Sequence, residues 1–274
     1  MDSLTLSVQD RWIDTPRGRL LARIWQPAGA DPALAPVLLF HDSLGCVELW
    51  RSFPEALALS SGRRVVAYDR PGFGQSAPRT DRLDSGFVGE EAEHVLPLLR
   101  QQLKIDRFVA FGHSVGGGMA VHCAARAPDA CEALVTESAQ AFVEDRTRAG
   151  IMQARELFRQ PGQFERLQRY HGDKARWVLS AWIDTWLSPE FAGWSLAPVL
   201  GQVRCPALVL HGSEDEYGSQ QHPLAIARGV AGPVELQIMP AVRHVPHREQ
   251  EAVVAARVTA FLATLTAAPG PSRS

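Results

Sequence analysis

Short runs of consecutive apolar residues recur along this chain, and they predict strands that are covered on both faces. Continuous runs of this length are typical of parallel sheets, where helices pack on either side. The runs are Val37–Phe40, Arg64–Tyr68, Phe108–Phe111, Glu132–Val135, Ala207–Leu210 and Val234–Ile238.

Segments with helical spacing separate these runs. In the last of them, Val254, Val258, Phe261 and Leu265 repeat at helical intervals. The other predicted helices are Leu49–Ser60, Phe87–Leu103 with a kink expected at Pro97, and Ala120–Ala127. Strands that alternate with helices predict the α/β class, with a mainly parallel, doubly wound sheet.

Two segments near the N-terminus alternate loosely between apolar and polar positions instead of forming solid runs. Leu4–Ile13 and Leu20–Trp25 flank Pro16-Arg17-Gly18, which reads as a turn. We therefore expect an antiparallel hairpin here, beside the otherwise parallel strands.

The alternation of strands and helices stops between residues 139 and 201. This stretch contains Trp177, Trp182, Trp186 and Trp194, and its apolar residues have helical spacing. It predicts a helical cap, residues 139–201, inserted between core segments 1–138 and 202–274. Tryptophans of this kind mainly fix a cap to its core, and we expect Trp182 and Trp186 to line a pocket as well. Because acidic and basic residues nearly balance in the cap, a highly charged substrate is not expected.

The sequence Gly112-His113-Ser114-Val115-Gly116 joins a predicted strand to a predicted helix. A sharp turn at this point presents a serine hydroxyl at the start of the helix, as a nucleophile requires. Glycine is needed at 112 and 116 because a Cβ there would collide with the neighbouring element. The alternative is a glycine-rich turn that cradles a phosphate, but no lysine follows the glycines as a P-loop needs.

A serine nucleophile needs a base, and the base needs an orienting acid. In sheets of this kind the expected chain order is serine, acid, histidine. Asp215 follows the strand that starts at Ala207, and His244 lies on the loop after the next strand, so we assign them as acid and base. His247, in the first turn of the last helix, is the rival base. The rival acids are Glu137, Glu214 and Glu216.

Attack on a carbonyl creates an oxyanion, which needs two N–H donors. The Val115 amide, at the N-terminus of the serine helix, is one candidate. The other is the backbone amide of Ser43, in the loop His41–Gly45 after an apolar strand. The alternative is that this loop is only a tight turn that carries Gly45.

Composition narrows the classes of function. The formal net charge is −2, which gives no electrostatic reason to expect binding to nucleic acid or to an anionic membrane. No apolar stretch approaches the ~20 residues of a membrane span, and we expect no secretory signal. The four cysteines have no C-x-x-C spacing and are expected to be reduced core residues of a cytoplasmic protein.

The chain resembles the α/β-hydrolase family, in its serine hydrolase branch. The resemblance covers nearly the whole length and rests on five segments in the family order: His41–Gly45, Asp69–Ser76, Gly112–Gly117, Gly212–Asp215 and Arg243–Glu249. It implies Ser114 as nucleophile, Asp215 as acid and His244 as base, with no metal or organic cofactor. Serine at the nucleophile position argues against the dehalogenase and epoxide hydrolase branches.

Two positions depart from the family pattern. Asp42 stands where the family usually has glycine, and Asp42-Ser43-Leu44-Gly45 is similar to the Asn-Ser-Leu-Gly of enol-lactone hydrolases. Arg243 replaces the glycine that usually precedes the histidine. We expect Asp42 and His113 to join Trp182 and Trp186 at the substrate pocket.

The sequence thus predicts a serine hydrolase, monomeric or homodimeric, that cleaves an ester-type bond of a small molecule through an acyl-enzyme. The alternatives that share this apparatus are a hydrolase of carbon–carbon bonds and a lactonase or thioesterase. Alternatives of another class are a non-catalytic ligand-binding protein and, more remotely, a cofactor-free oxygenase.

Overall fold

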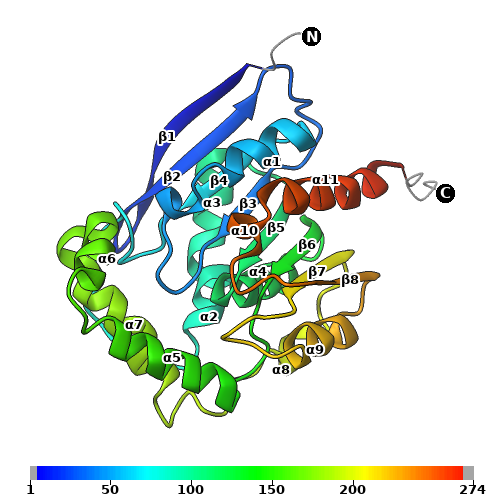
Figure 1. The fold of residues 1–274 in the computed structure, drawn as a ribbon. Helices are drawn as coiled ribbons and strands as arrows, with labels where there is room; N and C mark the ends of the chain where they lie inside the picture. Colours follow the sequence, from blue (N-terminus) through cyan, green and yellow to red (C-terminus); the bar gives the residue numbers. More distant parts are fainter. Residues whose placement is uncertain (1–4, 268–274) are drawn as a thin grey trace.

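A computed structural model describes residues 5–267 of the chain, and its centre is one eight-stranded sheet (Figure 1). The strand order is β1-β2-β4-β3-β5-β6-β7-β8. The strands are β1 (Leu6–Thr15), β2 (Gly18–Pro27), β3 (Val37–Phe40), β4 (Val65–Tyr68), β5 (Phe108–His113), β6 (Cys131–Glu137), β7 (Ala207–Gly212) and β8 (Val234–Met239). From β4 to β8 all neighbours pair in parallel, as predicted.

The predicted hairpin is formed by β1 and β2, which pair antiparallel along their full length. Gly18 closes its turn with a φ of 108°, a conformation that favours glycine. β2 also pairs antiparallel with β4, so the hairpin extends one edge of the parallel sheet. The first residue of the predicted hairpin, Leu4, lies outside the described residues.

Helices cover both faces of the sheet. The helices are α1 (Phe53–Ser61), α2 (Phe87–Glu90), α3 (Leu96–Leu103), α4 (Val115–Arg126), α5 (Asp145–Leu157), α6 (Gln163–His171), α7 (Ala175–Trp186), α8 (Ala197–Leu200), α9 (Gln221–Gly229), α10 (Pro246–Glu249) and α11 (Glu251–Ala267). Val47–Trp50 and Gly172–Lys174 form short 3-10 turns. α1 and α11 pack together on one face, and α2, α3, α4, α8 and α9 cover the other.

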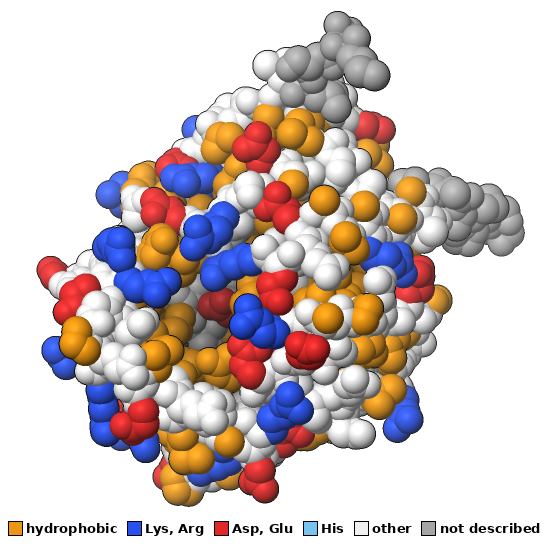
Figure 2. All heavy atoms as spheres, viewed as in Figure 1, with side chains coloured by type: hydrophobic (Ala, Val, Ile, Leu, Met, Phe, Trp, Pro, Cys, Tyr) orange, Lys and Arg blue, Asp and Glu red, His pale blue; other side chains and the backbone are white. Residues whose placement is uncertain are grey.

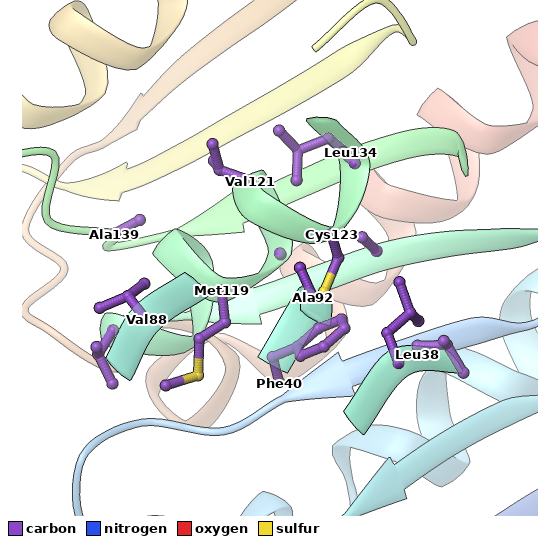
Figure 3. Close-up of a cluster of buried hydrophobic side chains, with 14 of the residues drawn as sticks. Leu38, Phe40, Val88, Ala92, Met119, Val121, Cys123, Leu134 and Ala139 are labelled. Atoms are coloured by element: carbon purple, nitrogen blue, oxygen red, sulfur yellow. The ribbon is translucent and has the colours of Figure 1, made fainter. Parts of the chain in front are cut away.

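Alternate residues of each central strand enter different cores. In β5, Ala110 belongs to the core beneath α4, whereas Phe111 packs with α1 and α11. Figure 3 shows the first of these cores, where Met119 of α4 and Phe40 of β3 lie among buried side chains of α2 and β6. The period-two alternation explains why the strands read as solid apolar runs.

The predicted helix over residues 87–103 is divided into three. α2 ends at Glu90, a wider π-helical turn follows over Glu91–Val95, and α3 begins at Leu96. Pro97 is the second residue of α3. In a regular helix its ring would clash with the backbone carbonyl of the residue four positions earlier, and it has no N–H to donate to that carbonyl. The break replaces the predicted kink.

The stretch between β6 and β7 carries the helices α5, α6 and α7, which arch over one end of the sheet (Figure 1). Its two ends meet where Phe142 and Ser195 form an isolated antiparallel bridge. Phe73 of the core packs with Leu167, Ala175 and Val178 in a small cluster that joins α6 and α7 to the sheet. α8, near the end of the stretch, packs instead on α4 and α9.

All four cysteines are buried and carry free thiols, in agreement with their expected place in the core. Within residues 5–267, no helix is both long enough and apolar enough to span a bilayer.

Candidate active site

Ser114 lies at a sharp turn between β5 and α4. Its φ of 56° and ψ of −126° are strained for a residue with a side chain. A Cβ on Gly112 would lie 2.0 Å from the carbonyl oxygen of Gly116, and a Cβ on Gly116 would lie 2.0 Å from that of Phe40. The two glycines therefore allow the close approach of elbow, helix and β3 that the sequence predicted.

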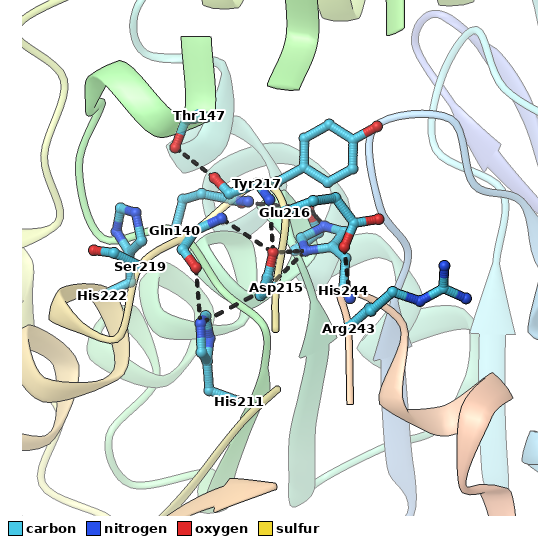
Figure 4. A network of polar contacts seen from close by, with 12 residues as sticks. Gln140, Thr147, His211, Asp215, Glu216, Tyr217, Ser219, His222, Arg243 and His244 are labelled. Atoms are coloured by element: carbon cyan, nitrogen blue, oxygen red, sulfur yellow. Dashed lines mark hydrogen bonds and ion pairs between the residues drawn. The ribbon is translucent and has the colours of Figure 1, made fainter. Parts of the chain in front are cut away.

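The structure brings Ser114, His244 and Asp215 together. His244 Nε2 lies 3.0 Å from Ser114 Oγ, and its Nδ1 lies 2.8 and 2.9 Å from the two carboxylate oxygens of Asp215. All three residues are buried. Figure 4 shows the Asp215 carboxylate beside the His244 ring. A serine hydroxyl, an imidazole and a carboxylate in this order can transfer a proton away from the hydroxyl.

Asp215 is held as a carboxylate. Its Oδ1 also accepts the backbone N–H groups of Tyr217, at 2.8 Å, and Gly218, at 3.0 Å. Burial opposes the negative charge, but the charge and hydrogen bond of His244 outweigh it and lower the pKa of Asp215 to about 2. With Asp215 ionised, His244 Nδ1 carries the proton and Nε2 is free to accept one from Ser114.

The rival residues have other partners. Glu137 ends β6 and binds His247 of α10, with 2.5 Å between Oε2 and Nδ1. Glu216 accepts the backbone N–H of His244 at 3.2 Å. The side chain of Glu214 is exposed. Among the carboxylates that the sequence considered, only Asp215 contacts the His244 ring.

A cavity of about 320 Å³ opens above Ser114, between the sheet and the helices α5 and α7. Figure 2 shows a hollow on this face, with hydrophobic and acidic side chains on its walls and basic side chains around its rim. The lining includes Asp42, Trp182 and Trp186, which the sequence predicts at the substrate pocket. The other lining residues are Ser43, Leu44, Leu49, Ser114, Gln140, Thr147, Ile151, Glu216, Tyr217, His244, Val245 and Arg248.

His113 does not line this cavity, which corrects the sequence expectation. It is the last residue of β5, so the strand alternation turns its side chain to the same face as Phe111. There it is 1% exposed and packs beside the rings of Trp50 and His247. His113 therefore lies beneath the floor of the pocket.

Sequence reasoning missed two neighbours of the candidate triad. Gln140, on the loop after β6, places Oε1 3.3 Å from Ser114 Oγ, and the Tyr217 ring lies 4.8 Å from the His244 ring. Gln140 follows the end of a core strand and Tyr217 follows Asp215 by two residues, so both lay where parallel strands deliver functional side chains. Their residue types gave no further signal.

The loop after β3 faces the cavity through Ser43, and several contacts hold it. Asp42 Oδ1 accepts the Leu44 N–H at 2.9 Å, and Arg70 donates to the Asp42 carbonyl at 2.7 Å. Val115 opens α4, so its amide has no acceptor in a preceding helical turn. Ser43 and Val115 therefore stay the predicted oxyanion donors.

One group of side chains has the composition of a metal site. His113, Glu137 and His247 offer ligand atoms that lie within 4.8 Å of one another. Protein groups already occupy these atoms: Nε2 of His113 lies 2.8 Å from the His244 carbonyl, and Nδ1 of His247 binds Glu137. The group is therefore explained as a set of hydrogen bonds and ion pairs.

Residues 35–196 match the model of a family described as "alpha/beta hydrolase fold". The chain is 31% identical over 270 residues to a dihydrolipoyllysine-residue acetyltransferase component of the acetoin cleaving system of Pseudomonas putida, covering 89% of this chain and 67% of that protein. It is 27% identical over 187 residues to the serine hydrolase BPHL of Homo sapiens, covering 67% of this chain and 64% of that protein.

A solved structure of a bacterial membrane phospholipase A superposes with a TM-score of 0.74. Its sequence is 23% identical, and the match covers 96% of this chain and 87% of that one. At this identity the likeness shows a shared fold.

Proposed function

The chain belongs to the α/β-hydrolase family, and from that premise we propose that it is a serine hydrolase of small, largely uncharged esters. The observation that carries the proposal is the contact of His244 with both Ser114 Oγ, at 3.0 Å, and Asp215, at 2.8 Å. That arrangement activates an alcohol for attack on a carbonyl without a metal or organic cofactor.

In the proposed first half-reaction, His244 Nε2 takes the Ser114 proton while Oγ bonds to the ester carbonyl carbon. The amides of Ser43 and Val115 donate to the oxyanion that forms. The tetrahedral adduct collapses when the carbon–oxygen bond to the leaving group breaks, and His244 gives its proton to that oxygen. An alcohol departs and the acyl group stays on Ser114.

In the second half-reaction, His244 takes a proton from water, whose oxygen attacks the acyl carbon. The second adduct breaks its bond to Ser114 Oγ, which recovers the proton from His244, and the carboxylic acid leaves. Asp215 remains ionised throughout and stabilises the imidazolium that forms in each half.

The residues of the pocket wall favour an uncharged ester as substrate. They do not favour a substrate that carries a carboxylate and is cleaved at a carbon–carbon bond. Enzymes that cleave the latter kind of substrate and resemble this fold usually bring a cap arginine to that carboxylate. Of the described residues that line the cavity, the only arginine is Arg248, and it comes from α10. Glu216 also faces the cavity and would repel an anionic substrate.

A panel of p-nitrophenyl esters, lactones, thioesters and ring-fission diketones tests this proposal. We expect the highest kcat/KM for short esters, given a cavity of about 320 Å³. Ser114→Ala should lower kcat by about 10⁶, as expected when a nucleophile is lost from a triad. Preferred turnover of ring-fission diketones, or esterase activity that survives Ser114→Ala, would contradict the proposal.

A further inference from the structure

Three loops of the candidate site meet at the His113 side chain. His113 itself precedes Ser114 in the elbow. Its Nε2 lies 2.8 Å from the carbonyl oxygen of His244, on the loop of the candidate base. Its Nδ1 lies 3.4 Å from Asp42 Oδ2, on the loop that offers the Ser43 amide. One buried ring therefore contacts both loops that must hold their positions during catalysis.

The two groups that face the nitrogens of the His113 ring, the His244 carbonyl and the Asp42 carboxylate, are both hydrogen-bond acceptors. A backbone carbonyl carries no proton, and an ionised carboxylate only accepts hydrogen bonds. The second oxygen of Asp42 already accepts the Leu44 N–H at 2.9 Å. A neutral imidazole has one N–H and would leave one acceptor facing a lone pair, whereas an imidazolium donates to both.

The charges around His113 favour the imidazolium. Asp42 faces Nδ1, Glu137 approaches from β6, His244 and His247 pack against the ring, and Arg248 lies near Asp42. Burial opposes a positive charge, but the close contact with the Asp42 carboxylate and the charge of Glu137 outweigh it and raise the pKa of His113. The hydrogen bond and charge of His113 in turn exceed the effect of burial on Asp42 and hold its pKa far below the usual range.

We propose that His113 is a positioning residue, an imidazolium that ties the Ser43 loop to the His244 loop. It donates to the Asp42 carboxylate with Nδ1 and to the His244 carbonyl with Nε2. The inference rests on the proposed function only in that the two loops are taken to carry the oxyanion donor and the base. His113 does not touch substrate in this proposal. Its loss would displace the oxyanion donor and the base but would remove neither.

The protonation state can be measured without any activity. Protein labelled with ¹⁵N-histidine is examined by NMR at pH 7.0, where an ordinary histidine is mostly neutral. We expect one buried ring with both nitrogens protonated, and its signals should vanish in His113→Gln. In Asp42→Asn the Nδ1 proton should be lost, because the carboxylate that stabilises it has become an amide. A neutral His113 ring in the wild-type protein would overturn the proposal.

Kinetics test the mechanical role. In His113→Phe, which keeps a ring but no donor, we expect kcat to fall about a hundredfold with KM changed less than about threefold. His113→Gln places an amide N–H near the position of Nε2 and should recover part of that loss through the bond to His244. His113→Asn places an amide N–H near the position of Nδ1 and should recover part of the loss through a bond to Asp42. His122→Phe, on α4 beyond the elbow, is the matched control and should keep the wild-type kcat.

The NMR experiment and the kinetic experiment can be interpreted independently of each other. If no substrate is turned over, the rate of Ser114 modification by a fluorophosphonate replaces kcat, and the NMR result stands by itself. If His113→Phe does not fold, the Gln and Asn variants and the wild-type spectrum decide. Wild-type kcat in His113→Phe, or equal losses in all three variants with a rise in KM, would contradict the role given to His113.

Discussion

Gly116 determines how closely the turn at Ser114 approaches the sheet. A Cβ at this position would lie 2.0 Å from the carbonyl oxygen of Phe40 in β3, and backbone atoms on both sides prevent an easy shift. The same contact places the N-terminus of α4 beside the loop that carries Ser43. Because residue 116 has no side chain, the strained turn at Ser114 can lie close to the loop that carries a proposed oxyanion donor.

Gly116→Ala should separate the elbow from β3 and reduce turnover at least a hundredfold, because displacements of about 1 Å have effects of this size. Gly201→Ala is the matched control, since its φ is −65° and no atom would lie within 4 Å of the new Cβ. The control should keep full activity and gain up to about 1 kcal/mol of stability. Steady-state kinetics and urea unfolding of both variants check this, and equal activity in both would contradict the tight packing.

Asp215 fixes the tautomer of the candidate base. Asp215→Asn keeps the size of the side chain but removes the charge that holds the proton on His244 Nδ1, so kcat should fall by about 10³ to 10⁴. Glu214→Gln changes an exposed carboxylate one residue away and should have no effect on kcat. Steady-state kinetics of the two variants measure the difference, and similar kcat values would remove Asp215 from the mechanism.

Among the elements, α6 contacts the Ser43 loop through the hydrogen bonds of His171 and through Leu44, which packs on the cluster that contains Leu167. His171 Nδ1 accepts the Gly74 N–H at 2.9 Å, and its Nε2 donates to the Leu44 carbonyl at 3.0 Å. This pattern requires a neutral ring. Burial, more than any other cause, lowers the pKa of His171 to about 4. The proposed cap and the proposed oxyanion loop are thus joined by a group that acid converts to a cation.

Acid should loosen this junction in a defined range. Because the pKa of His171 falls from its usual 6.5 to about 4 on folding, the unfolded state binds more protons between these values. Its contribution to stability is full above about pH 6.5 and is lost as the pH falls through 4. Hydrogen exchange should therefore show faster opening of α6 and α7 at pH 4 than at pH 7.

His171→Phe should open the same helices at pH 7 and remove most of their pH dependence. His94→Phe, on the exposed side of the π-helical turn, should match the wild-type protein at both pH values. Identical exchange in wild-type and His171→Phe proteins would show that this histidine does not hold α6 in place.

At the scale of the whole molecule, two aromatic-rich cores hold the sheet that carries these loops. Phe111 of β5 packs against Trp50 and Phe53, with ring centroids 6.0 and 5.4 Å apart. Ser114, the candidate nucleophile, follows Phe111 by three residues. The core on the α1 and α11 side therefore supports the elbow directly.

Phe111→Ala should lower the free energy of unfolding by about 3–5 kcal/mol, as expected for a large ring removed from a core. Val253→Ala, at a position 48% exposed on α11, should change it by less than about 0.5 kcal/mol. Urea titrations followed by circular dichroism compare the two. A small effect of Phe111→Ala would mean that this core can close over the gap.

The sequence predicted most of the sheet because its strands are solid apolar runs and parallel strands deliver their C-terminal loops to one edge. That rule predicts Ser114, Asp215 and His244 at one edge of the sheet. It could not decide where His113 points or that Gln140 reaches Ser114, because those facts depend on how loops far apart in the chain pack. The break before Pro97 was likewise hidden, since helical periodicity alone does not distinguish a kink from a π-helical turn.

The proposed mechanism requires that the alcohol of Ser114 bond covalently to substrate. Peptide mapping by mass spectrometry after brief exposure to a fluorophosphonate tests it most directly. We predict one adduct, on Ser114, in the wild-type protein, slower labelling in Asp215→Asn, and none in Ser114→Ala. An unlabelled Ser114 in folded, active protein, or labelling that persists in Ser114→Ala, would contradict the account.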